Sequence, residues 1–96
     1  MNGTIELSPY EYNMDETWMI ESNCENVRIW SEFFETEIYD ILWIGTKKYY
    51  GCWTWLGSKI KINQTMTNNT TIRFESNGVL NKKGFKLIWN CENKIN

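Results

Sequence analysis

The chain has 96 residues, of which 16% are aromatic, and it contains no histidine and one proline. This length predicts a single domain over residues 1–96, near the smallest size at which one core suffices. Without histidine the chain cannot form a Ser-His or Cys-His nucleophile pair. Nothing in the sequence supplies a substrate pocket for a carboxylate pair, so we expect no enzyme. No run of about eighteen apolar residues occurs, so we also expect no membrane span.

The charges are unevenly distributed along the chain. Residues 1–40 hold ten acids and Arg28 as the one base, whereas residues 41–96 hold nine bases and two acids. The acidic balance disfavours nucleic acid as a partner. Strands from the two halves can interleave and neutralise each other. If the halves separate on the surface instead, the acidic pole of one copy would attract the basic pole of the next.

The apolar pattern predicts short strands throughout. Val27 and Ile29 alternate with polar residues, with Phe33 or Phe34 next on the same face and Trp30 on the other. The run from Ile41 to Ile44 is too short for a helix and ends at a glycine, which is typical of a buried strand. The expected strands cover residues 2–9, 17–21, 27–33, 41–44, 59–62, 70–74 and 84–89. Short strands at this spacing predict an all-β, two-sheet antiparallel β-sandwich.

Four aromatic residues surround Gly51 and Cys52: Tyr49, Tyr50, Trp53 and Trp55. The two tryptophans are expected to share one face of a strand. Large aromatic side chains usually supply core area, so packing in the core or at its rim is the ordinary interpretation. The functional interpretation is a stacking surface for a sugar or for a side chain of a partner.

Two carboxylates, Glu37 and Asp40, precede the Ile41–Ile44 run. One interpretation is an acidic turn left in solvent at the start of a strand. The other is a hard-cation site, since oxygen ligands three residues apart at a bend can converge on calcium.

Secretion is indicated by the acceptor pattern for N-glycosylation. It begins at four asparagines, and three of them lie in one turn-like stretch: Asn2, Asn63, Asn68 and Asn69. N-glycans are therefore expected partners. Met1 leads directly into polar residues, so a signal peptide is not in this segment.

The three cysteines, Cys24, Cys52 and Cys91, lack the close pairs of a zinc site. One disulfide with one cysteine left over is the simplest account.

Six short motifs follow one another in an order that resembles the CUB domain, an extracellular β-sandwich module of complement proteases and cubilin-like receptors. They are distributed along most of the chain, from Gly3 to Phe85: Gly3-Thr4-Ile5 with Ser8-Pro9, Trp18-Met19-Ile20, Phe34-Glu35-Thr36-Glu37, Tyr39-Asp40 with Leu42, Thr71-Ile72-Arg73-Phe74-Glu75-Ser76-Asn77, and Gly84-Phe85. The resemblance implies a CUB-like jelly roll. It also implies calcium held by Glu37, Asp40 and Asn77, where the family has an aspartate at the third position. An amide oxygen brings no charge, so the affinity should be lower.

The cysteines depart from the family pattern. The first disulfide of the family is missing, since Glu16 occupies the position of its second cysteine. Cys52 resembles the surviving member of the second pair. Tracing the strands as the family folds them implies a bridge between Cys24 and Cys52, with Cys91 beyond the last strand, free or paired elsewhere.

These observations support three functions. The first is a non-catalytic extracellular module for protein recognition or adhesion, assisted by calcium, that binds through loops at one end of the sandwich. The second is a repeating unit of a secreted filament, coat or matrix that associates with neighbouring copies through its charged poles and Cys91. The third is carbohydrate binding by Tyr49, Tyr50, Trp53 and Trp55.

Overall fold

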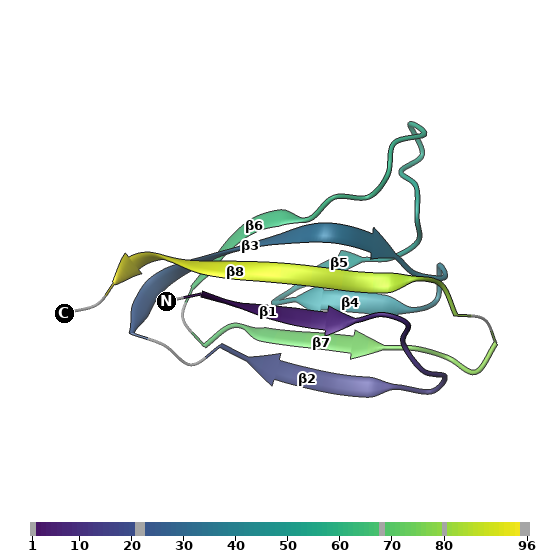
Figure 1. The fold of residues 1–96 in the computed structure, drawn as a ribbon, viewed down its shortest axis with the longest axis horizontal. Coiled ribbons are helices and arrows are strands. Elements are labelled where there is room, and N and C mark those ends of the chain that lie inside the picture. Colours follow the sequence, from purple (N-terminus) through teal and green to yellow (C-terminus); the bar gives the residue numbers. More distant parts are fainter. Residues whose placement is uncertain (1, 21–22, 68, 80, 95–96) are drawn as a thin grey trace.

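The computed structural model describes residues 2–20, 23–67, 69–79 and 81–94, which form two antiparallel four-stranded sheets packed as a β-sandwich (Figure 1). The strands are β1 (Asn2–Leu7), β2 (Asp15–Met19), β3 (Cys24–Glu35), β4 (Ile41–Ile44), β5 (Lys47–Tyr49), β6 (Asn63–Thr67), β7 (Thr71–Glu75) and β8 (Gly84–Lys94). The predicted fold class is confirmed. Over these same ranges, no helix has the length and apolar character needed to cross a bilayer.

One sheet has the strand order β1-β8-β3-β6 and the other β2-β7-β4-β5. Successive strands run in opposite directions along the long axis of the sandwich (Figure 1). The β1–β2, β3–β4, β5–β6 and β7–β8 connections therefore gather at one end, which we call the loop end. β1 begins and β8 ends at the opposite end.

A bulge in β3 decides which aromatic residue enters the core. The pairing of β3 with β8 shifts between Ser31 and Phe33. A bulge adds one residue to one strand and so moves the following side chains to the other face. Phe34 therefore points inward and is buried, whereas Phe33 lies partly exposed beneath Lys83.

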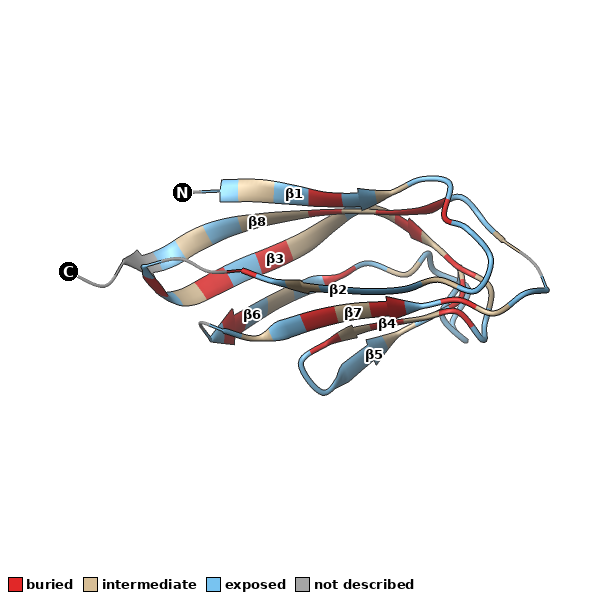
Figure 2. Cartoon of the chain, turned by 90° about the horizontal axis from the view of Figure 1, so that it is seen from below, coloured by how far each residue is buried: buried red, intermediate tan, exposed pale blue. Residues whose placement is uncertain are grey.

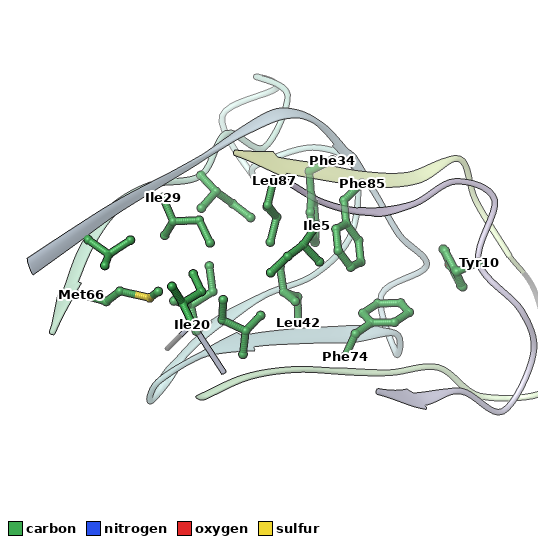
Figure 3. Packing of buried hydrophobic residues seen from close by; sticks show 14 of the residues in the cluster. Ile5, Tyr10, Ile20, Ile29, Phe34, Leu42, Met66, Phe74, Phe85 and Leu87 are labelled. Carbon is green, nitrogen blue, oxygen red and sulfur yellow. The ribbon is translucent and has the colours of Figure 1, made fainter. Parts of the chain in front are cut away.

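The core lies between the sheets, where inward residues are buried in alternation with more exposed ones, except on the edge strands β2 and β5, which have no buried residue (Figure 2). Aromatic rings form a continuous row toward the loop end (Figure 3). Phe34 stacks on Phe85 at 5.8 Å, Phe85 meets the edge of Phe74 at 5.1 Å, and Phe74 meets Tyr10 at 5.0 Å between ring centroids. Such pairs contribute about 0.5–1.5 kcal/mol beyond the area they bury. Tyr10 is thereby fixed between the core and the loops.

Two strand predictions are wrong in their positions. Residues 59–62 form no strand beyond an isolated bridge between Trp53 and Lys59. The strand lies instead at Asn63–Thr67, a polar segment whose Met66 is its buried residue. β8 continues past Trp89 to Lys94.

The expected bridge between Cys24 and Cys52 is wrong, because Cys24 is bonded to Cys91. The extension of β8 explains this. It runs antiparallel to β3, and its last residues lie beside the first residues of β3. The Cα atoms of Cys24 and Cys91 are therefore 5.6 Å apart, within the range that a disulfide spans. Cys52 forms no disulfide among the described residues and lies at the loop end.

The acidic and basic halves of the sequence interleave in the sandwich. β1 pairs with β8 and β2 with β7, so strands from the first half lie beside strands from the second. Arg73 binds Asp15 at 3.0 Å, and Lys86 binds Glu32 at 3.0 Å. These pairs are exposed and individually weak, but they place opposite charges on the same surfaces.

Candidate functional site

A buried carboxylate joins three of the four connections at the loop end. Asp40 is fully buried, in the connection between β3 and β4. Its Oδ2 accepts a hydrogen bond from the Tyr10 hydroxyl at 2.6 Å, and its Oδ1 accepts one from the backbone N–H of Asn77 at 2.9 Å. Tyr10 lies between β1 and β2, and Asn77 lies between β7 and β8, so one side chain fixes the relative positions of three loops.

The Tyr10 hydroxyl is saturated with hydrogen bonds. It accepts from the backbone N–H groups of Glu37 at 3.2 Å and Lys82 at 3.1 Å, and its proton goes to Asp40. Burial, followed by the hydrogen bond to Asp40, raises the pKa of Tyr10 to about 12. The two N–H groups act in the opposite direction and reduce this rise. Tyr10 therefore stays protonated at neutral pH and acts as a donor to Asp40.

Thr36 connects the fourth loop to the same cluster. Its hydroxyl donates to the carbonyl oxygen of Asp40 and accepts from the N–H of Gly51, both at 2.9 Å. The Thr36 N–H donates to the Gly51 carbonyl, also at 2.9 Å. Buried polar groups cost free energy unless they are hydrogen-bonded. Here their hydrogen bonds link all four connections of the loop end to one another.

The structure brings the expected calcium ligands into one region, but their oxygens serve other groups. Glu37 Oε2 accepts from the N–H of Tyr39 at 3.1 Å, and Asn77 Oδ1 accepts from the N–H of Val79 at 3.1 Å. Asp40 is occupied by Tyr10 and Asn77 as described. The described residues contain no cluster of three His, Cys, Asp or Glu side chains arranged for a metal. As arranged, the three side chains do not fit a calcium ion, because Glu37 and Asn77 would have to leave their turns. Calcium binding stays a prediction from the resemblance.

The aromatic cluster divides into one anchored and three exposed residues. Tyr49 is half-buried, meets Phe34 edge to face at 6.5 Å and donates to Gln64 at 2.7 Å. Burial raises its pKa. Tyr50, Trp53 and Trp55 are exposed, so the interpretation as core residues fails for these three.

Trp53 and Trp55 also do not lie on one face of a strand. They belong to a small hairpin, residues 53–59, that projects from the loop end (Figure 1, the teal loop between β5 and β6). The N–H of Gly57 donates to the Thr54 carbonyl at 2.9 Å, and the N–H of Thr54 donates to the Ser58 carbonyl at 2.7 Å. Gly57 has φ of 86°, which favours glycine. The turn thus places Trp55 at the tip.

Two hollows flank this hairpin. A groove of about 520 Å³ lies between the hairpin and β5, and its aromatic lining comes from Tyr49, Tyr50, Trp53 and Trp55. A second hollow of about 370 Å³ is bounded by Glu37, Ile38, Cys52 and Lys82, among others. The Cys52 thiol lies in this hollow and donates to the Thr36 carbonyl at 3.5 Å.

Sequence reasoning missed four exposed apolar residues at the loop end: Ile38, Tyr39, Leu56 and Val79. The available signal was their position in turn-forming segments between strands, as in the Leu56-Gly57 pair. At these four positions the side chain is left at the surface.

The acceptor asparagines are spread over the molecule. Asn2 is exposed on β1, and Asn69 is exposed in the turn before β7. Asn63 is exposed on β6, where its side-chain oxygen accepts from Arg28 at 3.1 Å. Asn68 lies outside the described residues.

Comparison of the chain with protein-family models and with curated proteins finds no match, so the likeness to the CUB domain rests on the motifs alone.

Proposed function

We propose that the chain is a non-catalytic extracellular recognition module that binds another protein through its loop end. One observation carries this proposal. Large apolar side chains are exposed on three separate connections of that end, and two of them, Ile38 and Tyr50, line the same hollow: Ile38 and Tyr39 after β3, Tyr50 after β5, and Val79 after β7. Exposed apolar residues that gather in one region are typical of interaction sites, whereas scattered ones are ordinary.

The rigidity of the loop end supports the same proposal. The hydrogen bonds of Asp40, Tyr10 and Thr36 hold all four connections, so little conformational entropy is lost when a partner binds. A site supported in this way is typical of binding surfaces on rigid scaffolds.

The extracellular location is supported by the Cys24–Cys91 disulfide at the opposite end, since such bonds persist mainly in oxidising compartments. The glycosylation pattern at Asn2, Asn63 and Asn69 agrees with this location, because all three side chains are exposed. The absence of histidine from the sequence supports a non-catalytic role.

Two observations favour this proposal over a self-associating filament unit. The interleaved strands mix the acidic and basic halves, which removes the basis for two charged poles. Cys91, which the filament hypothesis expects to join neighbouring copies, is bonded to Cys24 of the same chain.

The test is photo-crosslinking from defined positions. A photoreactive residue in place of Tyr39 is compared with one in place of Glu6, an exposed position on β1. With surface proteins of the source cells, we expect a discrete crosslinked product from position 39 and none from position 6. Unlabelled wild-type chain should compete, and the Ile38→Ser variant should compete poorly. Equal crosslinking from both positions, or competition that ignores Ile38, would contradict the proposal.

Carbohydrate binding is a second candidate, favoured by the groove that Tyr50, Trp53 and Trp55 line. Exposed aromatic faces can stack on sugar rings. Saturable quenching of tryptophan fluorescence by an oligosaccharide, lost in Trp53→Ser, would support it. Tryptophan fluorescence that stays unchanged with both neutral and acidic oligosaccharides would contradict carbohydrate binding.

A further inference from the structure

The hairpin 53–59 differs from the rest of the loop end because its apolar residues lie at the tip of a projection. Trp55 is 92% exposed and Leu56 is 74% exposed. They are the two central residues of the turn closed by the bond from Gly57 to Thr54. The loop between β5 and β6, which carries this turn, stands away from both sheets (Figure 1).

A convex apolar tip fits an apolar medium better than it fits a small polar ligand. Tryptophan is the side chain that most favours the boundary between water and the lipid headgroups. Leucine gains by entering the acyl region, where its side chain leaves water. A sugar would stack on Trp55 but would leave Leu56 in water.

Lysines surround the base of the hairpin. Lys59 lies on its second arm, with its Nζ 5.9 Å from the centroid of the Trp53 ring. Lys48 and Lys61 line the groove beside Trp55, and that groove has no acidic residue in its lining. In the described part of the chain the ion pairs involve Arg73 and Lys86, so these three lysines are available to other anions.

Three carboxylates lie nearby, and one of them, Glu37, bounds the hollow that Trp53 and Lys82 also line. Glu32 and Glu35 share a neighbouring hollow with Lys59, Lys61 and Lys83. Glu32 is paired with Lys86 at 3.0 Å. Lysines therefore outnumber the acids around the hairpin.

We propose that the hairpin 53–59 docks the protein on membranes that contain anionic lipid, with Trp55 and Leu56 entering the interface and Lys48, Lys59 and Lys61 binding the headgroups. An apolar tip and a basic collar match the two layers of an anionic membrane surface, and each lysine near such a surface strengthens binding about fivefold. This function goes beyond protein recognition, since the ligand is a lipid surface.

The test uses the full chain and protein-free vesicles in a co-sedimentation assay. One set contains phosphatidylcholine alone and the other contains about 30% phosphatidylserine. We expect binding to the anionic vesicles that weakens as ionic strength rises, because headgroup attraction is screened. The Trp55→Ser/Leu56→Ser variant should bind at least about tenfold more weakly. Met19→Ser is the matched control, since Met19 is an exposed apolar residue on β2, away from the hairpin.

A second variant tests the basic collar. Lys59→Gln/Lys61→Gln should reduce binding to anionic vesicles by about 25-fold, whereas Arg28→Gln, at an exposed position in the half of β3 away from the loop end, should leave it near the wild-type value. In the wild type, nitroxide-labelled lipid should quench tryptophan emission, and Trp55→Phe should remove most of that quenching.

Failure of the wild type to bind anionic vesicles would overturn the proposal, as would wild-type binding by the Trp55→Ser/Leu56→Ser variant. If these residues prove necessary for crosslinking to a protein while vesicles do not bind, the ligand of the hairpin is a protein and not a membrane. Crosslinking from position 39 depends on a different loop, so the two proposals can fail separately.

Discussion

Replacing Asp40 with asparagine tests whether the loop end is held by one buried carboxylate. Both carboxylate oxygens accept hydrogen bonds, one from the Tyr10 hydroxyl and one from the Asn77 N–H. An asparagine has one acceptor oxygen and one NH₂ group. In one orientation the NH₂ group faces the Asn77 N–H, which is also a donor. In the other it faces the Tyr10 hydroxyl, whose oxygen already accepts from the N–H groups of Glu37 and Lys82.

The expected cost follows from these contacts. The substitution removes one hydrogen bond to a charged acceptor, worth about 1.5–3 kcal/mol, and leaves a buried donor without a partner. We expect Asp40→Asn to lower the free energy of unfolding by about 3 kcal/mol. With a slope of about 1.5 kcal/mol/M, the urea midpoint falls by about 2 M.

The assay is equilibrium urea unfolding followed by tryptophan fluorescence, with the disulfide intact. Glu37→Gln is the matched control, because Glu37 undergoes the same chemical change three residues away and its amide oxygen can still accept from Tyr39. A loss below about 1 kcal/mol in Asp40→Asn, or a loss equal to that of the control, would refute the reasoning. A double-mutant cycle with Tyr10→Phe should show strong coupling, since the two side chains share one hydrogen bond.

Three further predictions concern the same fold. Replacing both Cys24 and Cys91 with serine opens a loop whose ends are 67 residues apart in sequence. This should lower the free energy of unfolding by about 4 kcal/mol, as measured by urea unfolding against the wild type. An unchanged urea midpoint would contradict the disulfide. The pKa of Tyr10 is about 12 in the folded state against 10.0 for an ordinary tyrosine, so its contribution to stability is present below pH 10 and declines as pH rises toward 12. The measurement is the difference in unfolding free energy between wild type and Tyr10→Phe across this range, and a difference independent of pH would contradict the shift. If calcium binds at Asp40 and Asn77, the melting temperature should be higher in calcium than in chelator, and this difference should disappear in Asn77→Ala. Equal melting temperatures in the two buffers would contradict calcium binding.

The alternation of apolar and polar residues predicts the fold class and most strands, because it reflects which face of each strand is buried. Leu42 and Ile44 are both fully buried on β4, as the run from Ile41 to Ile44 indicated. The bulge at Ser31 could not be predicted, since it depends on how β8 pairs with β3. For that reason the sequence left Phe33 and Phe34 as alternatives.

A last strand that ends at Trp89, as the sequence analysis predicts, leaves Cys91 outside the sheet and so does not predict the Cys24–Cys91 bond. Phe85, Leu87, Trp89 and Cys91 continue one alternation, with Cys91 as its last inward residue. A strand extended to Cys91 would have placed it beside the start of β3.

The candidate site was predicted in part. The structure joins Asp40 to Asn77 through the Asn77 backbone N–H, whereas the resemblance implies a calcium site built from their side chains, which stays a prediction. The role of Tyr10 depends on a contact across 30 residues that no local sequence pattern predicts. The tip of the hairpin at Trp55 was missed for a different reason. Its exposure follows from a turn at Gly57, and the spacing of Trp53 and Trp55 is equally compatible with a strand.

The Cys24–Cys91 bond also determines how the molecule responds to mechanical force. A pull applied between the first residue of β1 and the last of β8 separates two adjacent antiparallel strands from the same end, so their hydrogen bonds break one pair at a time. β1 and then β2 would be drawn out until the tension reaches Cys24. From there the covalent bond passes the load directly to Cys91. The chain between the two cysteines, which includes most of the loop end, is then outside the path of the force and is not extended.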